Sequence, residues 1–486
     1  MILHRLSPFF KNDLTRLRAC ANMPSVWEAE INALIASYEV DACTDDAISA
    51  IQSARRIIKI FICGLESDAV FKAKLEATAL TDWDIFSEPP APRALQDRLA
   101  GMLYIIGGSA DVPLIELGDQ TRYIGAALFN RCVSDKLAFD VNVADDNFTA
   151  LLFGAASEDA IANLAAYFLE SRRDITTRIL VQHNLPVWKT LEAPHEKMVL
   201  YRTLVKPYRA KVLAGKMRSV LTAIPTTRDA EIDGITYEDY TELYFRMCDQ
   251  PWDLIKTAQY KLIETLNATK ILHFTNDDGT DLTMNIDGFT FCNSVIARNI
   301  PGSEVFSAPR IDSTNGVIVA KGRFSAKDDA GGIMENLTLR FKDGELIEAK
   351  AERGQDQLDK TLSVDAGAKR IGEIGIGTNP YLKRHVASIL LSEKIGGSFH
   401  VALGDAYTMT DYMGDPVVVD NGNRSQLHWD ITTMLVGKGG RIEADGRAIM
   451  VDGLFTDPAL DVINRGWAAL PYDQRPASWQ NIYPEK

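Results

Sequence analysis

The spacing of apolar residues changes near the middle of the chain. In the first half, apolar residues recur at helical spacing. They predict helices over residues 25–38, 44–56 and 156–174, with a helix start at Thr44. Short uninterrupted apolar runs predict buried strands at 57–63, 102–108 and 216–225. Strands that alternate with helices indicate an α/β domain with a parallel sheet.

Alternation of apolar and polar residues replaces helical spacing beyond residue 269. Hairpin turns are predicted at Asp278-Gly279, Asp343-Gly344 and Asp445-Gly446, because Asp-Gly between alternating segments is a strong hairpin signal. One helix is expected over residues 381–394, with His385 on its solvated face. We therefore predict an α/β N-terminal domain over 1–270 and a β-rich α+β domain over 271–486. Two helices at 236–268, the second opened by Pro251, form the predicted connector.

Two predicted strands in the second half carry side chains that suit a metal. Alternate residues of a strand share a face, so His400 lies on one face of the strand at 398–403. His428 and Asp430 share a face of a second strand. Imidazole and carboxylate ligands suit a divalent ion such as Zn, Mn, Co or Fe. The alternative is a pair of core histidines beside a surface aspartate.

Two glutamates lie in apolar surroundings. Glu304 is bracketed by Pro301 and Pro309, and Glu373 lies in the glycine-spaced run IGEIGIG. A carboxylate in an apolar segment must be hydrogen-bonded, paired with a cation or bound to a metal. Taken singly, each is also compatible with a surface or capped glutamate.

Charge and composition exclude some partners and suggest a compartment. The net charge of −14 argues against nucleic acid and against an anionic membrane, since both attract basic surfaces. Six scattered cysteines without a C-x-x-C motif suggest a reducing compartment. Neither a secretory signal nor an apolar run long enough to span a membrane is found. We expect a cytoplasmic protein.

Four segments together resemble the M29 family of metallo-aminopeptidases, the thermophilic aminopeptidase T and S group. They are NIPGSEVFSAP, GEIGIGTNP, SEKIGGSFHVALGDAY and SQLHWD, in the family's order and at similar separations. The resemblance implies hydrolysis of the N-terminal residue of short peptides by a catalytic domain at 271–486. It also implies two divalent metal ions (Zn, Co or Mn) and a homodimer that encloses its active sites.

The resemblance also assigns roles to residues. The implied ligands are Glu304, Glu373, His400, His428 and Asp430, with Glu373 bridging the two ions. Tyr407, in HVALGDAY, matches a family tyrosine near the metals and would donate a hydrogen bond to an oxyanion. A packed tyrosine with a solvent-facing hydroxyl is the other interpretation of Tyr407.

Two rival functions remain open. The 2,5-dihydroxypyridine ring-opening dioxygenases share the fold and use one Fe(II), for which His400, His428 and Asp430 would form the ligand triad. Glu304 and Glu373 favour the peptidase, because an iron site of that kind does not require them. A specialised or non-catalytic member of the aminopeptidase family is the third possibility, suggested by the long N-terminal half.

Overall fold

The computed structural model divides into two compact units. It describes residues 8–40, 42–107, 112–183, 187–213, 216–296, 298–325 and 332–482. The first unit comprises Met1–Ala230 and Thr236–Glu242, and the second comprises Glu231–Ile235 and Leu243–Lys486. Among the described residues, no helix combines the length and the apolar character that crossing a membrane would require.

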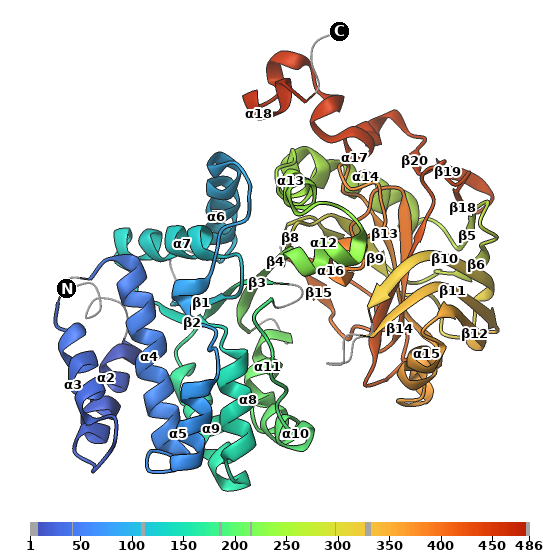
Figure 1. The fold of residues 1–486 in the computed structure, drawn as a ribbon. Helices are drawn as coiled ribbons and strands as arrows, with labels where there is room; N and C mark the ends of the chain where they lie inside the picture. The colour runs from blue at the N-terminus through green and yellow to red at the C-terminus, as the bar shows by residue number, and fades with distance from the viewer. Residues whose placement is uncertain are drawn as a thin grey trace. The chain divides into compact units, whose positions relative to one another are not determined.

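A parallel sheet forms the centre of the first unit (Figure 1). Its strands lie in the order β2, β1, β3, β4, and each neighbouring pair is parallel. The bounds are β1 Pro113–Leu117, β2 Asp140–Val143, β3 Thr177–His183 and β4 Arg218–Ile224. Right-handed connections then place the helix between β1 and β2 on one face, and the helices that follow β2 and β3 on the other.

Helices make up most of the rest of the first unit. They are α2 (Pro8–Ala21), α3 (Glu28–Ser37), α4 (Thr44–Ile62), α5 (Ala69–Ala77), α6 (Arg93–Gly107), α7 (Arg122–Ser134), α8 (Asp146–Ala155), α9 (Glu158–Ser171), α10 (His195–Leu204) and α11 (Lys206–Leu213). Two further helices, α12 (Thr227–Asp233) and α13 (Tyr237–Cys248), contain residues of both units, and α14 (Trp252–Asn267) belongs to the second. Two helices were predicted over 236–268, and Pro251 caps the second of them.

The predicted strands at 57–63 and 102–108 are wrong. Residues 57–62 continue α4, which begins at Thr44 as predicted, and residues 102–107 belong to α6; Gly108 lies outside the described residues. α4 is buried over a wide arc, and α6 carries the apolar Ile105 on its exposed face, so apolar residues run together in both helices without a visible helical period. Strands β1, β2 and β3 were not predicted, whereas β4 matches the strand expected at 216–225.

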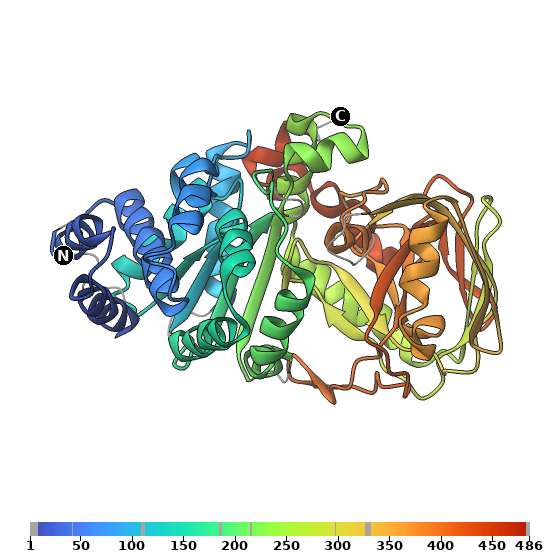
Figure 2. The ribbon, with the colours of Figure 1, turned by 60° about the horizontal axis from the view of Figure 1, so that its bottom comes forward.

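The second unit is rich in antiparallel strands, drawn yellow to red in Figure 2. The larger sheet has the order β12, β11, β10, β6, β5, β18, β19, β20, and a second has the order β17, β14, β13, β9, β7. The short strands β15 (Asp411–Tyr412) and β16 (Asp415–Pro416) pair with each other alone. The first sheet comprises β5 (Ile271–Thr275), β6 (Asp281–Asn285), β10 (Asn315–Ser325), β11 (Ile333–Lys342), β12 (Glu345–Arg353), β18 (Arg441–Ala444), β19 (Arg447–Val451) and β20 (Leu454–Phe455). The second comprises β7 (Cys292–Ser294), β9 (Glu304–Ser307), β13 (Ile371–Gly377), β14 (Ser398–Gly404) and β17 (His428–Met434). All three predicted hairpins are confirmed, as β5–β6, β11–β12 and β18–β19.

The two sheets of the second unit pack against each other through a shared apolar core. Phe274 on β5 stacks on Phe399 on β14, with ring centroids 4.3 Å apart. Val401, Leu403 and Trp429 join the same core. Successive side chains of a strand point to opposite faces, so the other face of β14 and β17 is free to carry polar groups. The predicted fold class, α/β followed by a β-rich part, is confirmed.

The helix predicted over 381–394 is wrong for most of its length. Only Ile389–Ser392 form a helix, α16, and the preceding segment is irregular. Tertiary hydrogen bonds replace helical ones there: the backbone N–H of Ala387 donates to Asp233, and that of Asn379 donates to the carbonyl of Lys394. His385 does not lie on a solvated face, because its ring packs edge-on against Phe324 at 4.8 Å.

Candidate metal centre

Strand registers bring all five predicted ligands to one face of the β17-β14-β13-β9-β7 sheet. Residues directly opposite each other on neighbouring strands share a face. Ala402 on β14 lies opposite both Asp430 and Glu373, which places these two carboxylates on the same side. His428 lies two residues from Asp430 and His400 two residues from Ala402, so both imidazoles share that side. Glu304 lies opposite Gly377 of β13 and completes the set.

Small residues between the ligands leave room for their side chains. Gly375 lies opposite His400, and a Cβ atom added at this glycine would stand 2.2 Å from the imidazole ring. Glycine at position 375 is therefore required by the histidine on the next strand. Register also shifts between Ile371 and Glu373, where β13 carries one extra residue against β14. Such a bulge re-aims the side chain that follows it, here Glu373.

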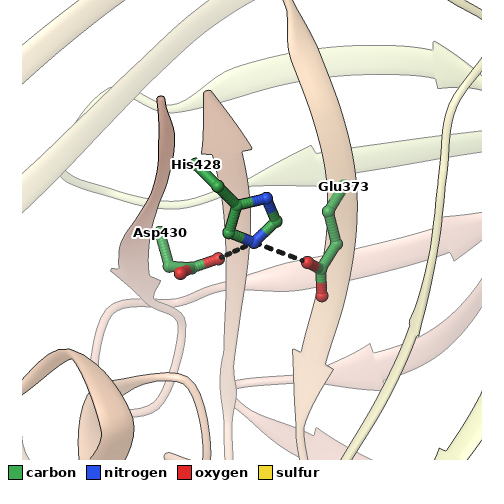
Figure 3. Close-up of side chains that lie close together, drawn as sticks. All are labelled: Glu373, His428 and Asp430. Atoms are coloured by element: carbon green, nitrogen blue, oxygen red, sulfur yellow. Dashed lines mark ion pairs between the residues drawn. The ribbon is translucent and has the colours of Figure 1, made fainter. Parts of the chain in front are cut away.

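Glu373, His428 and Asp430 form a compact group (Figure 3). Nε2 of His428 lies 3.2 Å from Oε2 of Glu373 and 3.5 Å from Oδ1 of Asp430. One potential ligand atom from each residue lies within 4.8 Å of the other two. Nδ1 of His428 lies 2.8 Å from the backbone oxygen of Asp405, to which it donates a hydrogen bond. That bond directs Nε2 toward the carboxylates, in the way that metal-binding histidines are usually oriented.

His400 and Glu304 lie on the other side of Glu373. Nε2 of His400 is 3.6 Å from Oε1 of Glu373 and 3.5 Å from Oε2 of Glu304. The two oxygens of Glu373 thus approach two different imidazoles. His400 therefore lies beside Glu304 and Glu373.

The carboxylates of the site hold both imidazoles in their charged form. Burial lowers the pKa of His428, but the carboxylates of Asp430 and Glu373, which accept from its ring, outweigh burial and raise the pKa to about 11. At His400 the carboxylates of Glu373 and Glu304 also outweigh the effect of burial, and they raise the pKa to about 9. Burial raises the pKa of Glu373, yet the two nearby imidazoles, of His400 and His428, lower it overall. The site therefore attracts positive charge.

These residues fit a metal ion. Oε2 of Glu304 and both ring nitrogens of His400 are buried without a hydrogen-bond partner. Buried polar atoms of this kind are costly unless something else satisfies them. The donors are carboxylate oxygens and imidazole nitrogens, the mixture preferred by Zn, Co and Mn. A cation would satisfy the orphaned atoms and displace the protons that the imidazoles hold.

Tyr407 lies at the border of the site. Its ring centroid is 5.3 Å from that of His428 and 5.4 Å from that of Phe306, and 40% of the residue's surface remains exposed. The negative charge of Glu373, followed by burial of the hydroxyl, raises the pKa of Tyr407 well above its ordinary value. The phenol therefore stays protonated and can donate a hydrogen bond.

Lys394 and Glu393 belong to the site but were not predicted. Nζ of Lys394 donates to Oε1 of Glu304 at 2.5 Å and to Oε2 of Glu393 at 2.9 Å. Burial raises the pKa of Glu393 to about 8, against the opposing charge of Lys394. The predicted helix over 381–394 hid both residues, because a charged pair at a helix end is ordinarily solvated. The available signal was the charged pair placed directly before the apolar strand β14.

Sequence comparison gives one family and a set of named relatives. The M29 family, described as thermophilic metalloprotease, matches residues 123–455, which is more than half of the chain. Aminopeptidase T of Thermus thermophilus is 28% identical over 226 residues, covering 42% of this chain and 51% of that protein. The alignment thus spans about half the length of this curated relative.

Structural comparison supports the fold. The solved structure of wild-type AmpT from Thermus thermophilus aligns with a TM-score of 0.62 at 21% identity, over 76% of this chain and all of that chain. The structure of 2,5-dihydroxypyridine dioxygenase from Pseudomonas putida KT2440 aligns with a TM-score of 0.46 at 15% identity, over 77% of this chain and all of that chain. Similarity at this second level supports no assignment of chemistry.

Proposed function

Since the chain belongs to the M29 family of thermophilic metalloproteases, we propose that it is an aminopeptidase with a binuclear metal site. Its substrates would be short peptides with a free N-terminus. Glu304, Glu373, His400, His428 and Asp430 would hold the two ions, and Glu373 would bridge them. All five residues belong to the second unit, in keeping with a catalytic domain in the second half of the chain.

One observation carries this proposal. The carboxylate of Glu373 directs Oε2 toward His428 and Oε1 toward His400, so each oxygen faces a separate group of donors. Asp430 completes the first group and Glu304 completes the second. A single ion held by His428 and Asp430 would leave Oε2 of Glu304 and Nε2 of His400 buried without a partner, which is costly.

The chain's own groups account for substrate binding and for stabilisation of the transition state. Divalent ions held here would polarise the scissile carbonyl and a water molecule. The excess of carboxylates suits the ammonium group of a peptide N-terminus, whereas an N-acetylated peptide lacks that charge. Tyr407, protonated and partly exposed beside His428, would donate to the oxyanion as the carbonyl carbon becomes tetrahedral.

Metal content and hydrolysis, measured together, test the proposal. The protein should be purified without chelator, and its metal-to-protein ratio compared with its activity on leucine amide and on N-acetyl-leucine amide. We expect two divalent ions per chain and hydrolysis of the free amine alone. His428→Ala should lower the metal content while leaving the circular dichroism spectrum unchanged. A single iron, with consumption of O₂ in the presence of 2,5-dihydroxypyridine, would establish the dioxygenase instead.

The family resemblance also leads us to propose a homodimer in the cytoplasm. A dimer that encloses its active sites would restrict substrates to short peptides. Light scattering at micromolar concentration gives the molecular mass directly, and a monomer would contradict the proposed dimer without affecting the proposed chemistry.

A further inference from the structure

A cavity of about 200 Å³ lies inside the first unit, remote in sequence from the metal centre. It is lined by side chains from α4, α8, α9 and α10 and from strands β1 and β2 (these elements are labelled in Figure 1). Polar groups and apolar groups both line it. The polar groups include three cations, Arg55, Lys59 and Arg172.

Arg55 is fully matched by carboxylates. Its Nε lies 2.9 Å from Oδ2 of Asp13, and its Nη2 lies 2.7 Å from Oδ1 of Asp140. A third donor, Nη1, bonds to the backbone oxygen of Val141 at 2.5 Å. Arg55 therefore fixes the wall of the cavity and has no charge to offer a ligand.

Lys59, one helical turn after Arg55, is different. It has no hydrogen-bond or ion-pair partner among the residues that the structure describes. The carboxylate that acts on it most strongly, Asp145, already accepts hydrogen bonds from Arg56 at both oxygens, at 2.7 and 2.9 Å. Lys59 is half-buried, and this burial lowers the pKa of its ammonium to about 8.

Arg172 adds a second group that can receive an anion. Its side chain is buried, and its Nε has no hydrogen-bond partner. The nearest carboxylate oxygen, Oε1 of Glu116, is 3.9 Å away, and the other oxygen of Glu116 is engaged by Arg178. The guanidinium lies 3.8 Å from the ring centroid of Phe168, which holds its plane in place.

Two of the cations at the cavity are only weakly paired: Lys59 has no ion-pair partner among the described residues, and Nε of Arg172 has no hydrogen-bond partner. The carboxylates near these cations are engaged elsewhere: Asp13 and Asp140 pair with Arg55, and Glu116 pairs with Arg178. An ammonium without a partner in a partly buried position is unfavourable. A ligand carboxylate would supply the partner that Lys59 lacks.

Aromatic and apolar residues form another part of the lining, which also includes the polar residues Glu116, Asn142, Thr149 and Ser171. Phe153 and Tyr201 meet edge to face at 5.3 Å, and Phe168 meets Tyr201 at 6.1 Å. Leu152 and Leu164 also line the cavity. An apolar cavity of about 150 Å³ accommodates benzene, so the present volume of about 200 Å³ has room for a ring and a carboxylate.

We propose that this cavity binds a small monocarboxylate with an aromatic or branched apolar group. The carboxylate would bind Lys59 and Arg172, and the apolar group would lie against Phe153, Phe168 and Tyr201. Inorganic phosphate would leave the aromatic lining uncovered. A free amino acid would bring a second ammonium close to Lys59. The proposal does not depend on the activity of the metal centre, because the cavity belongs to the first unit.

Calorimetric titration of the full-length protein with benzoate and phenylacetate tests the proposal. Three further compounds are titrated for comparison. Benzamide lacks the charge, inorganic phosphate lacks the ring, and phenylalanine adds an ammonium group. We expect benzoate or phenylacetate to bind at least ~10-fold more tightly than each of the three, the scale of a hydrogen-bonded charge. Equal binding of benzamide or phosphate, or no binding of either carboxylate, would overturn the proposal.

Variants of Lys59 locate the binding site. Lys59→Met should weaken binding at least ~10-fold, and Lys59→Arg, which keeps the charge, should retain it. Lys74→Met on α5 is the matched control, because Lys74 is exposed, and it should bind as the parent does. The melting temperature of ligand-free Lys59→Met should equal or exceed that of the parent, since an unpaired charge is removed, so loss of folding does not confound the result. Unchanged binding in Lys59→Met would contradict the assignment.

Discussion

Nζ of Lys394 lies 2.5 Å from Oε1 of Glu304, and the side chain of Lys394 has no exposed surface. The other oxygen of Glu304 faces His400 and has no hydrogen-bond partner. One carboxylate thus contacts a permanent cation with one oxygen and directs the second into the metal centre. Lys394 is therefore a positioning residue, which orients Glu304 through a charged hydrogen bond.

Lys394→Met should destabilise the metal-free protein. The substitution removes the cation from two buried carboxylates, Glu304 and Glu393, and loss of one member of a buried pair costs about 3–5 kcal/mol. A divalent ion can replace part of the lost charge, so Zn²⁺ should recover more stability in the variant than in the parent. Urea unfolding with and without Zn²⁺ measures both effects.

The matched control for Lys394→Met is Lys261→Met. Lys261 pairs with Glu264 on the exposed surface of α14, where an ion pair contributes little. This variant should unfold as the parent does under both conditions. If Lys394→Met matched the parent as well, Lys394 would have no positioning role.

Glu373→Gln should remove the second ion before the first. An amide keeps the size of the side chain but loses the negative charge between His400 and His428. Hydrolysis of leucine amide should fall by at least ~10²-fold, the scale for losing a major electrostatic element. Metal content should fall from two ions toward one, because His428 and Asp430 still offer ligands to a single ion.

Glu348→Gln is the control for Glu373→Gln, because it makes the same change of charge away from the metal centre. Glu348 lies on β12 and pairs with Arg340 and Lys350 at the surface. Its metal content and activity should equal those of the parent. Retention of both ions and full activity in Glu373→Gln would rule out a bridging role for that carboxylate.

Part of the ligand set could be predicted because side chains alternate between the two faces of a strand. This alternation places His428 and Asp430 on one face, and it places His400 and Phe399 on opposite faces. Which ligands on β9, β13, β14 and β17 lie next to one another depends on the registers of the sheet, and the local sequence does not specify these registers. The family resemblance supplied the grouping of Glu304 and Glu373 with the histidines.

The errors have two physical causes. Residues 57–62 are an apolar run in a helix buried over a wide arc, and the run at 102–107 is completed by the exposed Ile105; such runs resemble buried strands. The segment before α16 has helical spacing, but hydrogen bonds to Asp233 and Lys394 hold its backbone in another conformation. That second error concealed Lys394, because its burial depends on residues far away in sequence, such as Glu304.

His385 should make stability fall in mild acid. Burial, followed by the charge of Arg384, lowers the pKa of His385 to about 4 in the folded protein. The unfolded chain has the ordinary histidine pKa of about 6.5, so between pH 6.5 and 4 the unfolded state binds more protons. Stability from this group is therefore complete above pH 6.5 and is lost toward pH 4, by up to ~1.4 kcal/mol per pH unit.

His385→Phe should reduce this slope. The phenyl ring can keep the contact with Phe324, and the buried Nε2 of His385 has no hydrogen-bond partner to lose. Urea unfolding at pH 7.5, 6.5, 5.5 and 4.5 gives the slope for each variant. His195→Phe is the control, since His195 is exposed on α10. Identical slopes in the parent and His385→Phe would contradict the burial of a neutral imidazole.

Tyr407→Phe should lower kcat for leucine amide by roughly 10²-fold, the usual loss when one oxyanion donor is removed. The hydroxyl is expected to act only as the carbonyl oxygen gains negative charge, so KM should change little. Metal content should stay constant, because Tyr407 contacts His428 by its ring and is not among the proposed ligands.

Tyr412→Phe is the matched control: Tyr412 packs on the same Phe306, but its hydroxyl donates to Ser294. If both variants kept full kcat, the hydroxyl of Tyr407 would be a packing feature that faces solvent. If both lost kcat equally, the aromatic cluster around Phe306 would be responsible. Loss in Tyr407→Phe alone identifies the phenol as the donor.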